Sequence, residues 1–467
     1  MKLNKLPKFA LMALVGLSCV ACNTNTSGGT DGKTKVVFWH TMGAKNQELL
    51  EAMIASFEKE NPDIDVEHAA QGGYTDIESK LLKAIPAKTT PTMAYCYPDH
   101  VANYIKSNAA VKLNDLVNDP EIGLSAEELK DYQDTGFWSE GAAYDKEGSI
   151  YSVPFSKSTE VLFMNTTWMQ KNKLTVDGTE TGAPIVPTKW ENAEDPNDLT
   201  AMFNLCAKIK SIDSNITPLG YDSDDNMFIT LAAQYGIPYT SINEDGTGSI
   251  DFVNADAKAL VTRLKGYYDK GYFKTKGTLP NNSYTSTKFV EEELIMSIGS
   301  TGGTSYNEPK KDGDKQAFNV EVFRIPQANA ENPKMISQGP SITFFQNSKI
   351  SDAQVKASWK FYKHITNTYN SAAFAILTGY EPVRESSYNS DAYQAHLNNE
   401  EPTLFTKVAN LTVTEEIKNS YFFSPVFVGS SVARQQVGGI ITQVLLGEKN
   451  VDKAFEDAET ETIFALG

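Results

Sequence analysis

The sequence has few cysteines and none of the common catalytic or nucleotide-binding motifs. Four cysteines occur in 467 residues, and two of them, Cys19 and Cys22, lie near the N-terminus. Cys96 and Cys206 are far apart in the chain, so neither a disulfide scaffold nor a CxxC metal site is expected beyond that segment. The histidines form no HExxH or HxH string, and GxSxG, P-loop and GxGxxG strings do not occur. We therefore expect no metal, no cofactor and no enzymatic activity.

Positive charge is also scarce. The formal net charge is −17, and it is −20 without the three lysines of the N-terminal segment. A surface of this charge disfavours nucleic acid as a partner and weakly disfavours anionic ligands at long range. After residue 21 the sequence has no apolar run of membrane-spanning length.

The N-terminal segment has the pattern of a secretory signal. Three lysines precede an apolar run over 9–20, which is too short to span a membrane. A cysteine after a small residue is the acceptor pattern of a bacterial lipoprotein. Both Cys22 and Cys19 fit it, and Cys22 is favoured because a polar tether follows directly. The sequence predicts a signal peptide over 1–21, a tether over 22–33 and a lipid-anchored chain on the extracytoplasmic face of the cell membrane. A signal peptide with incidental cysteines is the alternative.

The residues after the tether alternate between strand and helix patterns. Strands are predicted at 35–39, 64–68 and 91–97, and a Thr75–Glu78 capping box precedes one intervening helix. The other helix, over 47–60, is predicted by an apolar stripe of Leu49, Leu50, Met53, Ile54 and Phe57. This order favours an α/β fold with a mostly parallel sheet and helices on both faces.

Similar patterns continue to the C-terminus. The polar, proline-containing stretch 166–200 is expected to be a surface insertion. Further strands are predicted at 148–155, 161–165, 294–298 and 342–345, and further helices at 353–366, 430–446 and 451–464.

Several strings, in order along the chain, resemble extracellular solute-binding proteins of bacterial ABC importers, family 1, which bind carbohydrates and glycerol phosphates. The longest, 154–165 (PFSKSTEVLFMN), matches the family signature except that Met164 stands where Tyr is usual. The others are 37–40 (VFWH), 57–62 (FEKENP), Gly73-Tyr74 and 378–383 (TGYEPV).

The resemblance implies a periplasmic-binding-protein-like fold of two discontinuous α/β lobes, a hinge and a ligand cleft. The expected lobes are 34–155 with 299–346, and 156–298 with 347–467. Hinges are expected near 153–160, 294–300 and 345–352. It also implies a monomeric binding subunit that delivers a small molecule to transmembrane permease subunits.

The ends of the predicted strands supply candidate ligand contacts. Trp39 offers a face for a sugar ring or is a packed core aromatic, and His40 contacts ligand or makes a structural hydrogen bond. Tyr97 and Asp99 follow the third strand, where the family often places a carboxylate; Asp99 could instead be a helix N-cap. Ser300 lies in a glycine-rich turn and could serve only that turn.

By resemblance to the glycerol-phosphate binders, Tyr74, Ser158, Gly339 and Tyr380 fall on ligand-contacting positions. Phenols and a serine hydroxyl can each donate and accept hydrogen bonds, which suits a hydroxyl-rich ligand. A glycine allows close approach of the backbone.

The departures from those binders favour a neutral ligand. Phe427 stands where they carry an arginine, and 221–226 (YDSDDN) replaces a stretch with two tryptophans. Asp222, Asp224 and Asp225 are candidates to line the cleft and accept hydroxyl protons; a solvated loop or a Ca²⁺ loop is the alternative.

The sequence thus predicts a receptor for a neutral sugar or oligosaccharide. A glycerol-3-phosphate or glycerophosphodiester receptor is the first alternative, favoured if Arg384 or Arg434 lies beside the ligand. A secreted glycoside hydrolase, which needs two opposed carboxylates, is the second.

Overall fold

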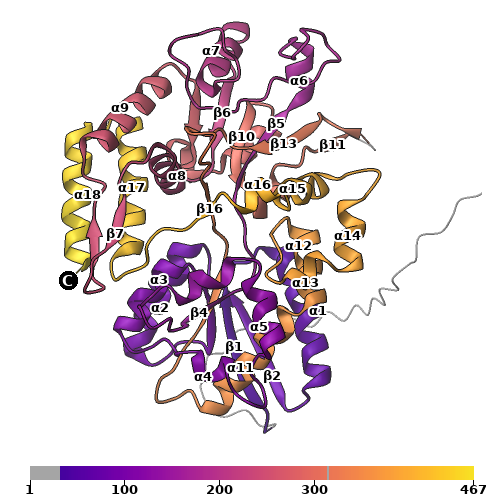
Figure 1. Ribbon diagram of the computed structural model, residues 1–467, viewed down its shortest axis with the longest axis vertical. Coiled ribbons are helices and arrows are strands. Elements are labelled where there is room, and N and C mark those ends of the chain that lie inside the picture. Colours follow the sequence, from indigo (N-terminus) through magenta and orange to yellow (C-terminus); the bar gives the residue numbers. More distant parts are fainter. Residues whose placement is uncertain (1–31, 313–314, 467) are drawn as a thin grey trace, which may run out of the picture.

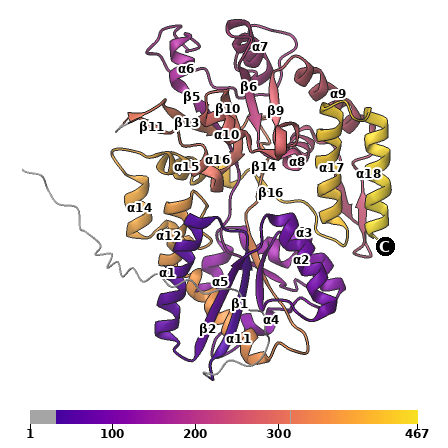
Figure 2. The ribbon, with the colours of Figure 1, turned by 180° about the vertical axis from the view of Figure 1, so that it is seen from behind.

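The computed structural model describes residues 32–312 and 315–466, which form two α/β lobes, one above the other in Figures 1 and 2. The predicted signal peptide, both candidate lipid-acceptor cysteines and most of the tether lie outside the described residues. Within the described ranges, no helix has the length and apolarity that crossing a membrane requires.

The first lobe is built on a five-stranded sheet in the order β2-β1-β3-β15-β4. Strand β1 pairs in parallel with β2 and β3, whereas β15 pairs antiparallel with β3 and β4. The strands are β1 (Thr34–His40), β2 (Ile64–Ala70), β3 (Met93–Cys96), β4 (Ser152–Pro154) and β15 (Ser341–Phe344). The helices of this lobe are α1 (Ala44–Glu60), α2 (Tyr74–Ala87), α3 (Pro98–Lys106), α4 (Asn114–Val117), α5 (Ala126–Gln133), η1 (Phe137–Ala142) and α11 (Asp352–Ile365).

The second lobe has a similar sheet in the order β13-β5-β10-β6-β9. Strands β10, β6 and β9 run parallel, and β5 is antiparallel to both β10 and β13. The strands are β5 (Glu160–Asn165), β6 (Thr217–Tyr221), β9 (Phe273–Thr275), β10 (Leu294–Ser300) and β13 (Val320–Arg324). The helices are α6 (Thr166–Lys171), α7 (Met202–Ile212), α8 (Asp224–Tyr235), α9 (Ala255–Asp269), η2 (Lys276–Thr278), η3 (Pro280–Asn282), α10 (Thr285–Val290), η4 (Thr301–Tyr306), α17 (Ser430–Leu445) and α18 (Val451–Leu466).

The remaining elements join these layers. Small two-stranded sheets are formed by β7 (Thr240–Ile242) with β8 (Gly248–Ile250), β11 (Lys311–Asp312) with β12 (Lys315–Gln316), and β14 (Met335–Ile336) with β16 (Tyr421–Phe422). Five helices continue from the first lobe along one side of the molecule to the second (Figure 1). They are α12 (Thr368–Thr378), α13 (Glu385–Tyr388), α14 (Asp391–Leu397), α15 (Leu404–Thr412) and α16 (Glu415–Lys418).

The two sheets confirm the predicted α/β fold, and the helical stripe of α1 is buried as its spacing predicts. Leu50, Met53, Ile54 and Phe57 recur at helical spacing and pack into the core of the first lobe. The predicted Thr75–Glu78 capping box is wrong. Helix α2 starts at Tyr74 with Gly73 rather than Thr75 as its N-cap, and the Asp76 carboxylate accepts from the N–H of Gly73 at 2.9 Å.

The structure divides the chain between the lobes differently from the predicted boundaries. Strand β13 lies in the predicted range of the first lobe, yet it pairs with β5 because Val320 packs beside Val161 and Phe163 in a second-lobe core. Helix α11 lies in the predicted range of the second lobe. It instead covers β1, and its Trp359 and Phe361 are buried in the core of the first lobe.

Three chain segments meet where the lobes join. The segment between β4 and β5 passes from one sheet to the other, as expected near 153–160. There Ser158 exchanges backbone hydrogen bonds with Gln338, at 2.8 and 2.9 Å. Next to it, Lys157 exchanges backbone bonds with Glu381, at 3.3 and 2.6 Å. The second and third contacts between lobes therefore centre on 338 and 381 rather than on the expected 294–300 and 345–352.

Gly339 allows these segments to come together. Its φ is +95°, and a Cβ atom there would lie 2.5 Å from the carbonyl oxygen of Ser156 and 2.9 Å from Cα of Lys157. A side chain at this position therefore meets both an unfavourable backbone conformation and a steric clash with main-chain atoms.

We predict that Gly339→Ala lowers the free energy of unfolding by about 3 kcal/mol or more, because strain and clash add. Gly246→Ala is the matched control: its φ is +85°, but a Cβ would have no atom within 4 Å. The control should lose only about 1 kcal/mol, the cost of the backbone conformation. Urea denaturation of both variants measures the difference, and equal losses would contradict the steric account.

Candidate ligand-binding cleft

A cavity of about 1010 Å³ lies between the two lobes. Its lining includes Thr41 and Pro98, which follow parallel strands β1 and β3 of the first sheet. It also includes Asp222, Lys276 and Ser300, which lie at or just beyond the ends of β6, β9 and β10 in the second. The carboxyl ends of the parallel strands in both sheets thus border one cavity, which is where open α/β sheets bind ligands.

Tyrosines form much of the wall. The rings of Tyr74 and Tyr97 stack with their centroids 4.0 Å apart and their planes 14° apart. The Tyr380 ring lies against Gly302, where a Cβ atom would come within 2.4 Å of the ring. Burial raises the pKa of Tyr74, Tyr97 and Tyr380 above the ordinary value of 10.0, so these phenols keep their protons near neutrality. The tyrosines in the lining are Tyr74, Tyr95, Tyr97, Tyr239, Tyr284, Tyr306 and Tyr380.

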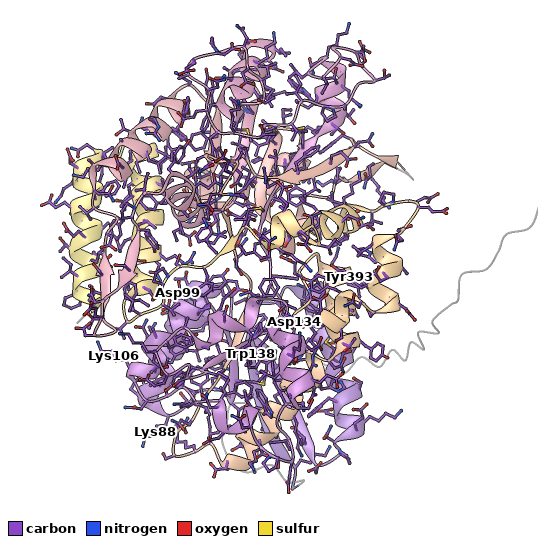
Figure 3. All side chains as sticks on the ribbon, viewed as in Figure 1. Lys88, Asp99, Lys106, Asp134, Trp138 and Tyr393 are labelled. Carbon is purple, nitrogen blue, oxygen red and sulfur yellow. The ribbon has the colours of Figure 1, made fainter. Side chains whose placement is uncertain are left out.

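Arg434, on α17, is held by two carboxylates. Its Nε donates to Asp99 Oδ2 at 2.8 Å, and its Nη1 lies 3.4 Å from Asp225 Oδ2. Nη1 also donates to Asn226 Oδ1 at 2.8 Å. Burial alone raises the pKa of Asp99, but Arg434 and His100 together hold it below its ordinary value. Asp99 is thus the partner of an arginine and lies inside α3, so it is not the helix N-cap; Tyr97 is. Figure 3 shows Asp99 at the boundary between the lobes.

The joining segments also present polar groups to the cavity. Ser158 Oγ and Gln338 Nε2 are buried and line it, and neither has a hydrogen-bond partner among the described residues. Gln338 Oε1 accepts from Asn226 Nδ2 at 2.8 Å, which fixes the amide. These two donors lie on adjacent segments joined by backbone hydrogen bonds and can bind oxygen atoms of a ligand.

Lys157 lies beside these groups but is fully committed to the protein. Its side chain has no exposed surface, and Nζ donates to Glu140 Oε2 at 2.6 Å and to the Gly339 carbonyl at 3.3 Å. Ser337 Oγ donates to the other oxygen of Glu140 at 2.5 Å. The ion pair therefore stabilises the junction of the lobes.

The predicted acidic segment does line the cavity, but most of its oxygens accept from protein donors. Asp222 Oδ1 accepts from Thr285 Oγ1 at 2.7 Å, next to the N-terminus of α10. Asp224 accepts from Thr275 Oγ1 at 2.5 Å and from the Gly277 N–H at 2.8 Å. Ser223 bonds Asp225, whose other oxygen faces Arg434. These carboxylates therefore position loops as well as lining the cavity.

Ser300 and Gly339 also line the cavity. The Ser300 hydroxyl accepts from the Gly302 N–H at 3.1 Å, so it stabilises the glycine-rich turn, which was the alternative to ligand contact. The space that Gly339 leaves is filled by the backbone at Ser156 and Lys157.

Three predicted site residues lie outside the cavity lining. Trp39 packs on the core of the first lobe, because the pleat of β1 turns it away. His40 is buried, accepts from the Met42 N–H at Nδ1 and pairs through Nε2 with His68 at 3.0 Å; burial lowers its pKa to about 4. Phe427 packs its ring on Gly248 of β8, where a Cβ would come within 1.9 Å.

Glu160, Gln338 and Tyr239 line the cavity and were not predicted. Gln338 adjoins the predicted Gly339, and Glu160 lies inside the signature string, so both had a local signal. Tyr239 follows α8, and no string near it in the sequence indicates a ligand contact. Glu160 is buried, and its Oε2 accepts from Tyr221 Oη at 2.6 Å. Burial raises its pKa to about 8, so it is mostly protonated at pH 7.

The raised pKa of Glu160 predicts a pH dependence of stability. The unfolded carboxyl ionises near its ordinary value of 4.5 while the folded one keeps its proton to about pH 8. Stability from this group is therefore complete below pH 4.5, falls as pH rises, and is lost above pH 8. Glu160→Gln should flatten this part of the curve, by about 1.4 kcal/mol per pKa unit removed.

Urea denaturation at pH 5, 7 and 9 measures the effect. The exposed Glu127→Gln variant, in α5, is the control and should keep the wild-type pH dependence. A Glu160→Gln curve parallel to the wild-type curve over this range would show that Glu160 is ionised in the folded protein.

Comparison with known proteins identifies similar chains. Over 424 residues the chain is 23% identical to the sn-glycerol-3-phosphate-binding periplasmic protein UgpB of Escherichia coli strain K12, covering 86% of this chain and 89% of that protein. The crystal structure of UgpB from Mycobacterium tuberculosis in complex with glycerophosphocholine has a TM-score of 0.72 at 17% identity, covering 93% and 99% of the two chains.

The GacH receptor of Streptomyces glaucescens, determined unliganded and with acarbose, has a TM-score of 0.69 at 17% identity, covering 93% and 98% of the two chains. These likenesses at low identity show the shared two-lobed fold. Residues 52–401 match the sequence profile described as bacterial extracellular solute-binding protein, which is most of the chain. The chain belongs to the bacterial extracellular solute-binding protein family.

Proposed function

We propose that this protein is the solute-capturing subunit of an ABC importer and binds a neutral, hydroxyl-rich ligand, a sugar or an oligosaccharide. The lobes would close on the ligand about the segments joined at Lys157, Gln338 and Glu381, and the closed form would dock on the permease. The observation that carries the proposal is the state of the basic side chains in the cleft.

Of the lysine and arginine side chains that line the cavity, within the described residues, two are paired with carboxylates and the third lies over an aromatic ring. Lys157 is paired with Glu140, Arg434 with Asp99 and Asp225, and Lys276 Nζ lies 4.0 Å from the centre of the Tyr284 ring. Acidic side chains outnumber them in the lining: Asp76, Asp99, Glu140, Glu160, Asp222, Asp224 and Asp225. A phosphate would lose its hydration among these carboxylates and find only Lys276 without a carboxylate partner, whereas sugar hydroxyls can donate to carboxylates and accept from Ser158 and Gln338.

The size of the cleft supports a ligand larger than a single small metabolite. Its volume of about 1010 Å³ is at the upper end of the roughly 300–1,000 Å³ range of ligand pockets. The stacked pair Tyr74 and Tyr97 and the exposed rings of Tyr284 and Tyr306 offer apolar faces to the C–H sides of successive sugar rings. An oligosaccharide or glycoside uses both features.

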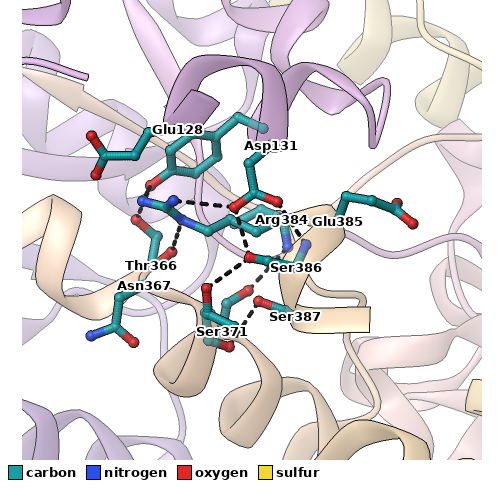
Figure 4. A network of polar contacts seen from close by, with 12 residues as sticks. Glu128, Asp131, Thr366, Asn367, Ser371, Arg384, Glu385, Ser386 and Ser387 are labelled. Carbon is teal, nitrogen blue, oxygen red and sulfur yellow. Dashed lines mark hydrogen bonds and ion pairs between the residues drawn. The ribbon is translucent and has the colours of Figure 1, made fainter. Parts of the chain in front are cut away.

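Glycerol 3-phosphate or a glycerophosphodiester is the second candidate. It is favoured by Arg434 in the cleft lining and by the similarity to a glycerol-3-phosphate-binding protein. Arg384 does not support this candidate, because it lies outside the cleft lining. Its Nε donates to the Thr366 carbonyl at 2.6 Å and its Nη1 to Asp131 at 3.2 Å (Figure 4). The glycoside hydrolase hypothesis predicts turnover of a bound oligosaccharide, which chromatography of the recovered ligand tests.

We predict that calorimetry with a panel of neutral oligosaccharides finds a ligand whose affinity changes little between low and high salt, because no ion pair forms. Ser158→Ala should weaken that binding by about 1 kcal/mol, the typical net value of one hydrogen bond. Ser348→Ala, in an exposed loop, is the control and should bind as the wild type does. Tight binding of sn-glycerol 3-phosphate that fades as salt rises would instead favour the second candidate.

We also propose that the mature chain begins at Cys22 and carries lipid on it. The supporting pattern is the apolar segment ending at Val20-Ala21 and the polar tether after Cys22. Intact mass of detergent-extracted protein should match a chain starting at Cys22 with two or three acyl chains. Cys22→Ser should abolish the lipid mass and Cys19→Ser should not; the reverse pattern would assign the anchor to Cys19.

A further inference from the structure

Arg434 is the one arginine that lines the cleft within residues 32–312 and 315–466, and it bridges the lobes. Asp99 lies on α3 of the first lobe, whereas Asp225 and Asn226 lie on α8 of the second. The three residues bind the guanidinium through Nε and Nη1 at 2.8 to 3.4 Å. Its side chain is only 18% exposed, so water screens these contacts weakly.

The surroundings keep the guanidinium in this position. Helix α17 contacts α3 through Asn103 Nδ2, which donates to Ser431 Oγ at 3.2 Å, and it contacts α2 through Gln435 Nε2, 3.4 Å from Glu78 Oε2. The Tyr97 ring centre lies 5.8 Å from Cζ of Arg434. An anion that approached Arg434 would therefore have to displace two carboxylates, and each would repel it.

We propose that Asp99 and Asp225 are the specificity-determining residues of this cleft: by occupying Arg434 they exclude phosphate monoesters. The inference rests on the proposed function, because it explains how a cleft that contains an arginine selects neutral ligands. Arginine is otherwise well suited to bind phosphate, through paired N–H donors. Without the two carboxylates, the cleft contains a buried guanidinium that needs an anionic partner.

The test uses the double variant Asp99→Asn/Asp225→Asn, with sn-glycerol 3-phosphate and inorganic phosphate as probes in isothermal titration calorimetry. Asparagine keeps the size of each side chain and removes its charge. The wild-type protein should give no measurable binding of either probe. The double variant should bind sn-glycerol 3-phosphate at least roughly 100-fold more tightly than the wild type, the gain from two charge-assisted hydrogen bonds. That binding should weaken as salt rises.

Two controls assign the gain to Arg434. Adding Arg434→Gln to the double variant should abolish it. Asp63→Asn/Asp256→Asn, at two exposed positions, changes the net charge equally and should leave the probe unbound. If the double variant does not fold, Asp225→Asn alone is measured; that side chain is 32% exposed, and the single variant should show a smaller gain of roughly tenfold.

The outcomes separate the inference from the proposed function. A folded double variant that does not bind sn-glycerol 3-phosphate, or a triple variant that binds it equally well, overturns the inference and leaves the neutral-ligand proposal standing. Micromolar, salt-sensitive binding of sn-glycerol 3-phosphate by the wild-type protein overturns both, because the native cleft would then accept a phosphate monoester.

Discussion

The junction of the lobes depends on one buried ion pair, between Lys157 and Glu140. Lys157 has no exposed surface, and its backbone pairs with Glu381 while Nζ reaches Glu140 and the carbonyl of Gly339. One residue thus fixes the positions of the segments that cross between the sheets. Loss of one partner from a buried pair typically costs about 3–5 kcal/mol, so this contact contributes strongly to holding together the segments that carry the neighbouring donors Ser158 and Gln338.

A second constraint is the low supply of free positive charge in the cleft. Lysine and arginine are present there, but Lys157 and Arg434 are paired with carboxylates, and Lys276 lies over the ring of Tyr284. The hydroxyl, phenol and amide groups that remain are neutral near pH 7. A cleft of this chemistry selects by the number and direction of hydrogen bonds rather than by charge.

The alternation of strands and helices and the strand ends could be predicted from the sequence, because both depend on local periodicity. Most predicted site residues line the cavity for this reason, and their contact with a ligand stays a prediction. The misses have long-range causes. The β8 backbone covers Phe427, and Trp39 lies partly buried against the core of the first lobe. Arg434 and Asp99 are 335 residues apart in sequence and meet only when the two lobes come together. None of these contacts has a local signature.

The most direct test of this account is a crystal structure of the protein bound to the tightest ligand from the calorimetric panel. We expect a neutral, hydroxyl-rich molecule between the lobes, with hydrogen bonds from Ser158 and Gln338 and with Arg434 still bonded to Asp99 and Asp225. A phosphate or carboxylate group seated on Arg434, with those two aspartates displaced, would contradict the account.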